Sequence, residues 1–143
     1  MATVKIQLPP VFSFDTMIPI RITDLNYGGH VGNDSVLSII HEARIQFLRQ
    51  FGYDEMNVGT ASLIMLNVVI DFRKELFYGD VIKVSVKALE FSKIGFDLCY
   101  KLEKVTEGKS VVVAAATTGM ICYDYGNKKI SSVPEEVKLN LLR

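Results

Sequence analysis

Residues 26–51 read NYGGHVGNDSVLSIIHEARIQFLRQF, and this stretch decides the fold. It opens with a glycine-rich turn, in which glycines allow a sharp backbone path that other residues resist. Asn33 and Asp34 are favourable helix N-caps, so a helix is predicted over residues 34–51, with Gly52 placed to end it as a left-handed cap. A helix of about 17 residues is roughly 26 Å long and crosses most of a sheet. Its predicted buried face carries apolar residues at helical spacing: Val36, Ile40, Ala43, Phe47 and Phe51.

Strand patterns lie on both sides of this helix in the sequence. One strand is predicted before it, over residues 12–23. Four more are predicted after it, separated by short turns, over residues 62–76, 81–91, 96–105 and 110–125. Strands joined by short turns are antiparallel, and Pro134 opens a short C-terminal helix over residues 135–142. We therefore expect residues 1–143 to form one α+β domain, with one long helix on a single antiparallel sheet.

Composition narrows the function classes. The 16 basic and 16 acidic residues cancel, so no basic excess favours nucleic acid as a partner. Two histidines and two cysteines, without CxxC or HExxH spacing, predict no metal site, and Cys99 and Cys122 are expected to be reduced thiols in the core. The first residues lack the apolar region of a signal peptide, and the longest apolar runs are too short to cross a bilayer. We expect a cytoplasmic protein with no membrane partner.

Four short motifs, in this order, resemble those of the hotdog-fold thioesterase superfamily, the group of 4-hydroxybenzoyl-CoA and acyl-CoA thioesterases. Residues 21–33, RITDLNYGGHVGN, resemble the signature Asp-x-Asp-x-x-x-His-Val-Asn-Asn. Residues 41–44, HEAR, are similar to Glu-Ala-Arg on the central helix of that family. Residues 70–75, IDFRKE, with 78–80, YGD, resemble its Asp-Phe-x-Lys-Pro and Gly-Asp pair, and the last long strand carries TGM at 118–120.

This resemblance implies a hotdog fold, in which an antiparallel sheet wraps around the long helix. It also implies hydrolysis of an acyl-CoA or acyl-carrier thioester, with no cofactor other than the coenzyme A moiety of the substrate. The resemblance further implies a homodimer with active sites at the interface, often paired again into a tetramer. The apolar segment 63–70 is the expected pairing element, because unprotected strand edges invite association.

The signature also implies where the site lies. Thioester hydrolysis needs a stabilised oxyanion, an activated water and a positioned substrate. Backbone N–H groups of residues 29–32, at the positive end of the helix, suit the developing oxyanion, and His30 is expected to orient the carbonyl or to shuttle a proton. Arg73 and Lys74 are candidates for the phosphates of coenzyme A. The remaining substrate-binding candidates are Tyr27, Gly28, Gly29, Val31, Gly32 and Asn33.

One position departs from the family pattern. The second acidic residue of the signature, often the catalytic carboxylate, is Asn26, and an amide cannot act as nucleophile or general base. Asn26 is therefore expected either to hydrogen-bond the water or the carbonyl, or to stabilise the turn by an Asx contact. Glu42 on the helix is the leading candidate for general base; the alternative is a solvated or ion-paired helix residue. Asp24 is either a substitute carboxylate or a strand-end residue bonded to backbone.

Two other functions stay open at this point. Asp24-x-Asn26 followed by His30 faintly resembles the hydratase motif Asp-x-Asn-Pro-x-His, but the proline is missing and the histidine comes one residue late. This leaves a hotdog hydratase or dehydratase acting on 2-enoyl thioesters as the weaker alternative. The amide at Asn26 also leaves open a protein that binds acyl thioesters without turnover.

Overall fold

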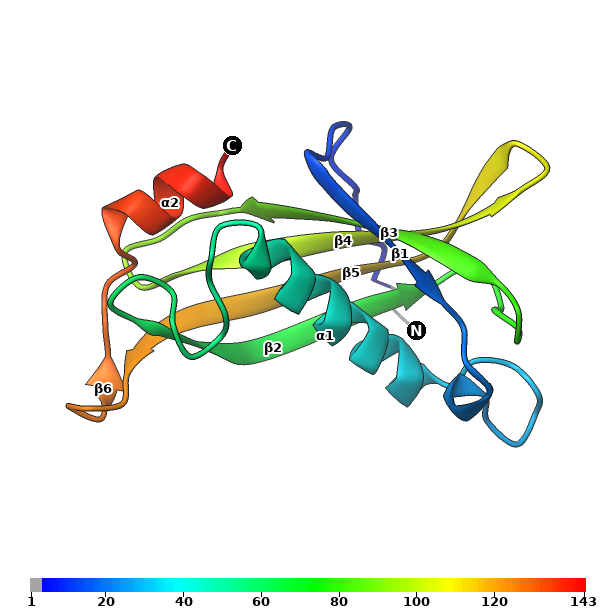
Figure 1. Ribbon diagram of the computed structural model, residues 1–143, viewed down its shortest axis with the longest axis horizontal. Helices are drawn as coiled ribbons and strands as arrows, with labels where there is room; N and C mark the ends of the chain where they lie inside the picture. The colour runs from blue at the N-terminus through cyan, green and yellow to red at the C-terminus, as the bar shows by residue number, and fades with distance from the viewer. Residues whose placement is uncertain (1–3) are drawn as a thin grey trace.

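The computed structural model describes residues 4–143, and Figure 1 shows one long helix lying across a twisted antiparallel sheet. The predicted α+β arrangement, with a long helix, one sheet and a short C-terminal helix, is confirmed. The elements in chain order are β1 (Phe14–Pro19), a 3-10 helix (Ile22–Asp24), α1 (Asn33–Arg49), β2 (Ser62–Phe72), β3 (Val81–Leu89), β4 (Gly95–Thr106), β5 (Lys109–Asp124), β6 (Lys129–Ile130) and α2 (Glu135–Leu141).

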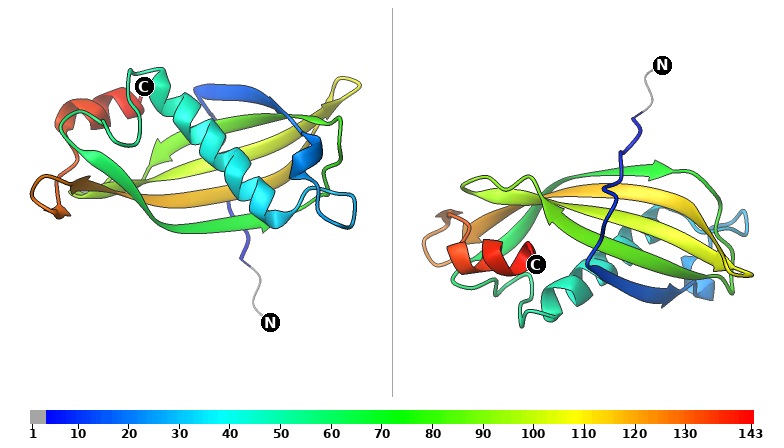
Figure 2. Two further views of the ribbon diagram at one scale, coloured as in Figure 1. Left: turned by 60° about the horizontal axis from the view of Figure 1, so that its bottom comes forward. Right: turned by 90° about the horizontal axis from the view of Figure 1, so that it is seen from above.

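The sheet has the strand order β1-β3-β4-β5-β2, and every pair of neighbours is antiparallel. The short β6 adds to the end of β5. Helix α1 covers one face of the sheet, while the segment before β1 crosses the opposite face (Figure 2). Strands β1 and β2 are thus the two edges, and the amino end of α1 lies near the end of the sheet where β2 stops.

Three predicted strands are shorter in the structure, and β3 ends at Leu89 rather than at residue 91. The other two are those before and after the long helix. Strand β1 ends at Pro19 rather than at residue 23, because the chain turns there into the 3-10 helix. The carboxylate of Asp24 accepts the backbone N–H of Arg21 at 2.8 Å and so closes the first turn of this helix. Strand β2 ends at Phe72 rather than at residue 76. The backbone N–H groups of Arg73 and Lys74 both donate to the carbonyl of Val113, at 2.9 and 3.0 Å, and this interrupts the ladder. The segment after Phe72 is thereby released toward the amino end of α1.

Helix α1 ends at Arg49, two residues before the predicted end. Gly52 has a φ of 78°, the left-handed conformation predicted for it. Its N–H donates to the carbonyl of Arg49, so a short turn separates the end of α1 from Gly52. Among the helices of residues 4–143, none is long and apolar enough to cross a bilayer.

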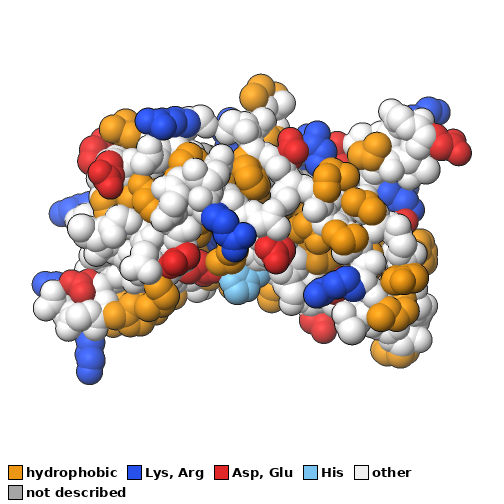
Figure 3. All heavy atoms as spheres, in the orientation of Figure 1, with side chains coloured by type: hydrophobic (Ala, Val, Ile, Leu, Met, Phe, Trp, Pro, Cys, Tyr) orange, Lys and Arg blue, Asp and Glu red, His pale blue; other side chains and the backbone are white. Residues whose placement is uncertain are grey.

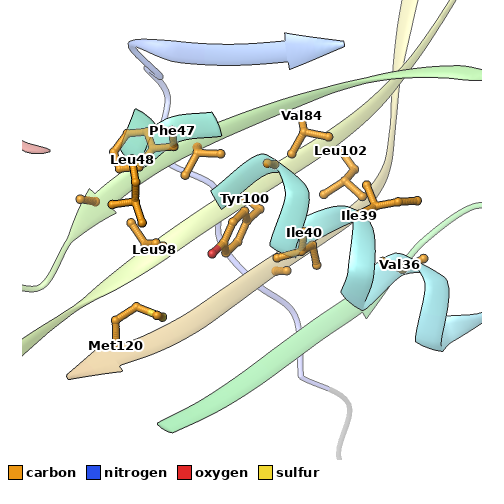
Figure 4. Close-up of a cluster of buried hydrophobic side chains, with 14 of the residues drawn as sticks. Val36, Ile39, Ile40, Phe47, Leu48, Val84, Leu98, Tyr100, Leu102 and Met120 are labelled. Carbon is orange, nitrogen blue, oxygen red and sulfur yellow. The ribbon is translucent and has the colours of Figure 1, made fainter. Parts of the chain in front are cut away.

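The core lies between α1 and the sheet (Figure 4). The contacting side chains include Val36, Ile39, Ile40, Phe47 and Leu48 of α1 and Val84, Leu98, Tyr100, Leu102 and Met120 of the sheet. Cys99 and Cys122 are free and buried, as predicted. Burial raises the pKa of the Cys122 thiol to about 11 and also raises the pKa of Cys99, so both stay protonated at neutral pH.

One charged group interrupts this apolar layer. The side chain of Arg44 on α1 is only 5% exposed, and its Nε lies 3.6 Å from a carboxylate oxygen of Glu55. The same oxygen lies 2.7 Å from Nε2 of His41, and Arg44 also donates to the hydroxyl of Tyr100 at 3.3 Å. Tyr100 in turn shares a hydrogen bond of 2.9 Å with Thr118. Glu55 therefore balances a buried guanidinium that the rest of the core cannot solvate.

Candidate functional site

A cleft of about 690 Å³ opens beside the amino end of α1. Its walls are the loop before α1 and the segment after β2, and Val113 and Ala114 of β5 also line it. The backbone N–H of Val31 donates to the carbonyl of Leu76 at 2.8 Å, which ties the two walls together. Side chains that are far apart in the sequence thus face one space.

Most of the residues predicted for the site border this cleft: Asn26, Tyr27, His30, Val31, Gly32, Asn33, Arg73 and Lys74. Gly28 and Gly29 shape the same loop without lining the cleft. Tyr27 stands at its rim, fully exposed. In the space-filling view, charged side chains lie over α1, and hydrophobic side chains gather at the end where β1 and the loop before α1 lie (Figure 3).

Asp24 and Glu42 line a different hollow, of about 240 Å³, between β1 and α1. Asp24 is buried, and its carboxylate pairs with the guanidinium of Arg21 at 3.2 Å as well as with the backbone. Glu42 is exposed and accepts a hydrogen bond of 3.0 Å from Gln46. In this chain neither carboxylate shares the cleft of His30, and the catalytic roles predicted for them stay predictions.

The loop uses most of the backbone donors that were expected to bind an oxyanion. The N–H groups of Gly29, Val31 and Gly32 donate to the carbonyls of Asn26, Leu76 and Asp24. Val31 and Gly32 are buried, so their N–H groups need such acceptors within the protein. Of the four predicted amides, that of His30 alone finds no acceptor among residues 4–143.

The first turn of α1 supplies further donors. Its N-cap, Gly32, has no side chain to accept hydrogen bonds from the helix, and the first amides of any helix lack an intrahelical partner. The N–H groups of Asn33 and Ser35 find no acceptor within the part of the chain that the structure describes. Donors and helix dipole together favour negative charge at this end of the cleft.

Asn26 combines the two roles considered for it. Its Oδ1 accepts the backbone N–H of Gly28 at 2.8 Å, which is an Asx contact that holds the turn. This bond fixes the orientation of the amide, and its Nδ2 has no acceptor among residues 4–143. Asn26 can therefore hold the loop and still donate a hydrogen bond into the cleft.

Residues 20–141 match the family model of the thioesterase-like superfamily. The chain belongs to the thioesterase-like superfamily. It is 31% identical over 101 residues to the 1,4-dihydroxy-2-naphthoyl-CoA hydrolase of Rippkaea orientalis, an alignment that covers 68% of this chain and 73% of the relative. The prediction of a thioesterase of the 4-hydroxybenzoyl-CoA thioesterase type is confirmed at the level of the family.

Solved structures show the same fold in this superfamily. A hypothetical protein from Aquifex aeolicus superposes with a TM-score of 0.77 at 29% identity, covering 91% of this chain and 99% of the other. The 1,4-dihydroxy-2-naphthoyl-CoA thioesterase from Synechocystis superposes with a TM-score of 0.78 at 21% identity, covering 90% and 94%. The predicted hotdog arrangement of helix and sheet is confirmed.

The charged side chains and the histidine of the thioesterase cleft differ in the partners that they already have. The guanidinium of Arg73 pairs with Asp71 at 3.1 Å and donates to the carbonyl of Ile6 at 2.9 Å, so it already has partners. The ammonium of Lys74 makes no ion pair within residues 4–143. Nε2 of His30 lies 3.9 Å from a carboxylate oxygen of Glu75, and its Nδ1 lies 3.4 Å from the carbonyl of Val31.

Sequence reasoning missed three polar or aromatic residues of the thioesterase cleft: Asp34, Phe72 and Glu75. Asp34 had been considered only as a helix cap. Phe72 and Glu75 belong to a segment that had been predicted as continuous strand. Glu75 lies beside His30 because the hydrogen-bond ladder of β2 ends after Phe72. No local sequence pattern predicts where that ladder ends.

Proposed function

We propose that this protein hydrolyses acyl-CoA thioesters in the cleft at the amino end of α1. The proposal rests on one observation. The backbone N–H groups of His30 and Asn33, at the positive end of α1, have no acceptor among residues 4–143, and both residues line the same cleft as the imidazole of His30. Acyl transfer to water needs both, a set of donors for the oxyanion and a base for the water. No cofactor enters this proposal beyond the coenzyme A moiety of the substrate.

The residues of the cleft suggest the following reaction. The thioester carbonyl accepts hydrogen bonds from the backbone N–H groups of His30 and Asn33 and from Nδ2 of Asn26. A water attacks the carbonyl carbon, and Nε2 of His30 takes its proton. The tetrahedral oxyanion then collapses, the carbon–sulfur bond breaks, and the thiolate receives the proton from the imidazolium. The products are the free acid and coenzyme A.

The lining of the cleft favours an aromatic acyl group. Tyr27 and Phe72 border it, and aliphatic surface comes from Val36, Leu76 and Val113. Flat rings pack well against such side chains. A relative is named for the hydrolysis of 1,4-dihydroxy-2-naphthoyl-CoA, which fits an aromatic substrate. Lys74, which is free of ion pairs, is the candidate for a phosphate of coenzyme A.

A substrate panel with a thiol reagent tests this function. We expect release of free coenzyme A, with naphthoyl- and benzoyl-CoA giving a higher kcat/KM than octanoyl- or acetyl-CoA. The two buried thiols of the protein contribute little background, because both are protonated and covered. Hydration of crotonyl-CoA without thiol release, or tight binding of the esters without turnover, would replace this proposal by the hydratase or the binding protein.

We further propose that the protein is a homodimer or a dimer of dimers joined along β2. Among the described strands β2 pairs only with β5, so the other side of its backbone is unpaired. Leu66 on this strand is 65% exposed, and Phe72 is exposed where β2 meets the cleft. A second chain paired here would cover apolar surface and close one side of the site.

Light scattering on the eluting protein measures this association. We expect a mass of two or four times the chain mass of 16.0 kDa. Val69→Lys on β2 is expected to yield monomers, because a charge on an edge strand opposes pairing. Val105→Lys on β4 is the matched control, since Val105 is exposed to a similar extent, 47% against 41%, but lies away from this edge. A monomeric wild-type protein would refute the proposed association.

A further inference from the structure

We propose that Glu75 is a positioning residue of the thioesterase site, a carboxylate that holds the attacking water together with His30 and stabilises the imidazolium that forms during the reaction. This inference rests on the function proposed above and adds a residue to it. Asn26 brings an amide to the cleft, so a negative charge beside the base has to come from elsewhere. Glu75 supplies it from the segment after β2.

The backbone fixes this pair. The N–H of Val31, next to His30, donates to the carbonyl of Leu76, next to Glu75, at 2.8 Å. The two N–H bonds from Arg73 and Lys74 to the carbonyl of Val113 anchor the other end of the segment. These backbone bonds bring the side chains of His30 and Glu75, which are 36% and 65% exposed, next to each other at the cleft. Their separation, 3.9 Å between Nε2 and Oε1, is short for a charge pair and too long for a direct hydrogen bond.

The cleft also holds other charged groups. Asp34 on α1 and Arg73 and Lys74 on the segment after β2 line the same cleft, and Tyr27 stands at its rim. Glu75 alone among the charged groups of residues 4–143 pairs with the imidazole of His30. Arg73 is held by Asp71, so it does not neutralise Glu75.

The spacing suits one bridging water. Two acceptors at this distance, Nε2 of the neutral imidazole and the carboxylate of Glu75, can each accept one O–H of the same water. Its lone pair then points to the acyl carbon. When the water attacks, its proton moves to Nε2, and the imidazolium forms next to the negative charge of Glu75. The proton leaves on the sulfur of coenzyme A, so Glu75 ends the cycle unchanged.

Glu75→Gln tests the role by the split between kcat and KM. Glutamine keeps the size of the side chain but carries no charge that would stabilise the imidazolium. We expect kcat to fall at least about fivefold and KM to stay within about twofold of the wild type, because the charge of Glu75 acts when the imidazolium forms. Glu75→Asp, which keeps the charge on a shorter side chain, is expected to fall between the two.

Glu136→Gln on the exposed face of α2 is the matched control and should leave kcat and KM unchanged. A wild-type kcat in Glu75→Gln, with an active wild type, would overturn this role alone. A wild type that hydrolyses no ester of the panel would overturn the proposed function and this role together.

Discussion

His30→Gln is expected to lower kcat about 100-fold, because a positioned base contributes on the order of 10²–10⁴ to a proton-transfer step. Glutamine keeps the polarity and much of the size of the side chain but cannot take a proton from water. The imidazole is half-buried in the cleft and makes no bond that the fold depends on. The measurement is kcat and KM on the best ester of the panel, with unfolding temperature recorded beside them.

His41→Gln is the matched control for this prediction. His41 lies over Glu55, outside the cleft, so its replacement should leave kcat within about twofold. If His30→Gln kept wild-type kcat while folding normally, the imidazole would have no part in the reaction. The backbone donors at the amino end of α1 would then have to act with a different base, and Glu42→Gln would be the next variant to measure.

Glu55→Gln is expected to lower the free energy of unfolding by about 2–3 kcal/mol, because removing one partner of a buried ion pair leaves the other charge uncompensated. The side chain of Arg44 is 5% exposed, and its Nε finds no hydrogen-bond acceptor in the described chain. The value lies below the range of about 3–5 kcal/mol for fully buried pairs, because the side chain of Glu55 is 23% exposed. Urea denaturation followed by far-ultraviolet circular dichroism measures the difference.

The double variant Arg44→Met, Glu55→Gln separates this explanation from a loss of loop structure. Methionine fills much of the same space without a charge, so the double variant should recover most of the stability that Glu55→Gln alone loses. Equal destabilisation in the single and the double variant would show that Glu55 acts through its own loop. A single variant as stable as the wild type would mean that water solvates Arg44 from the side of Glu55.

The site shows how far local sequence information reaches. The sequence predicted the glycine-rich turn, the start of the helix after it and the polar residues between them. All of these lie within the signature of residues 21–33. Which amides of the turn stay free was not predictable, because the acceptors of Val31 and Gly32 depend on how distant backbone packs against the loop. Glu42 illustrates the same limit. Its helical position was clear from the sequence, but the side of α1 that faces β1 became known only with the fold.

The sequence alone determined the elements: a helix of 3.6-residue period, strands of period two, and the turns between them. These are set by side-chain spacing and backbone preferences within a few residues. The predicted N-caps, Asn33 and Asp34, were wrong, because the N-cap is Gly32 and both residues lie in the first turn of the helix. Tertiary structure decided the strand order β1-β3-β4-β5-β2, the end of β2 at Phe72 and the approach of Glu75 to His30. Each of these depends on hydrogen bonds between segments far apart in the chain, such as that from Val31 to Leu76, and no short stretch of residues encodes them.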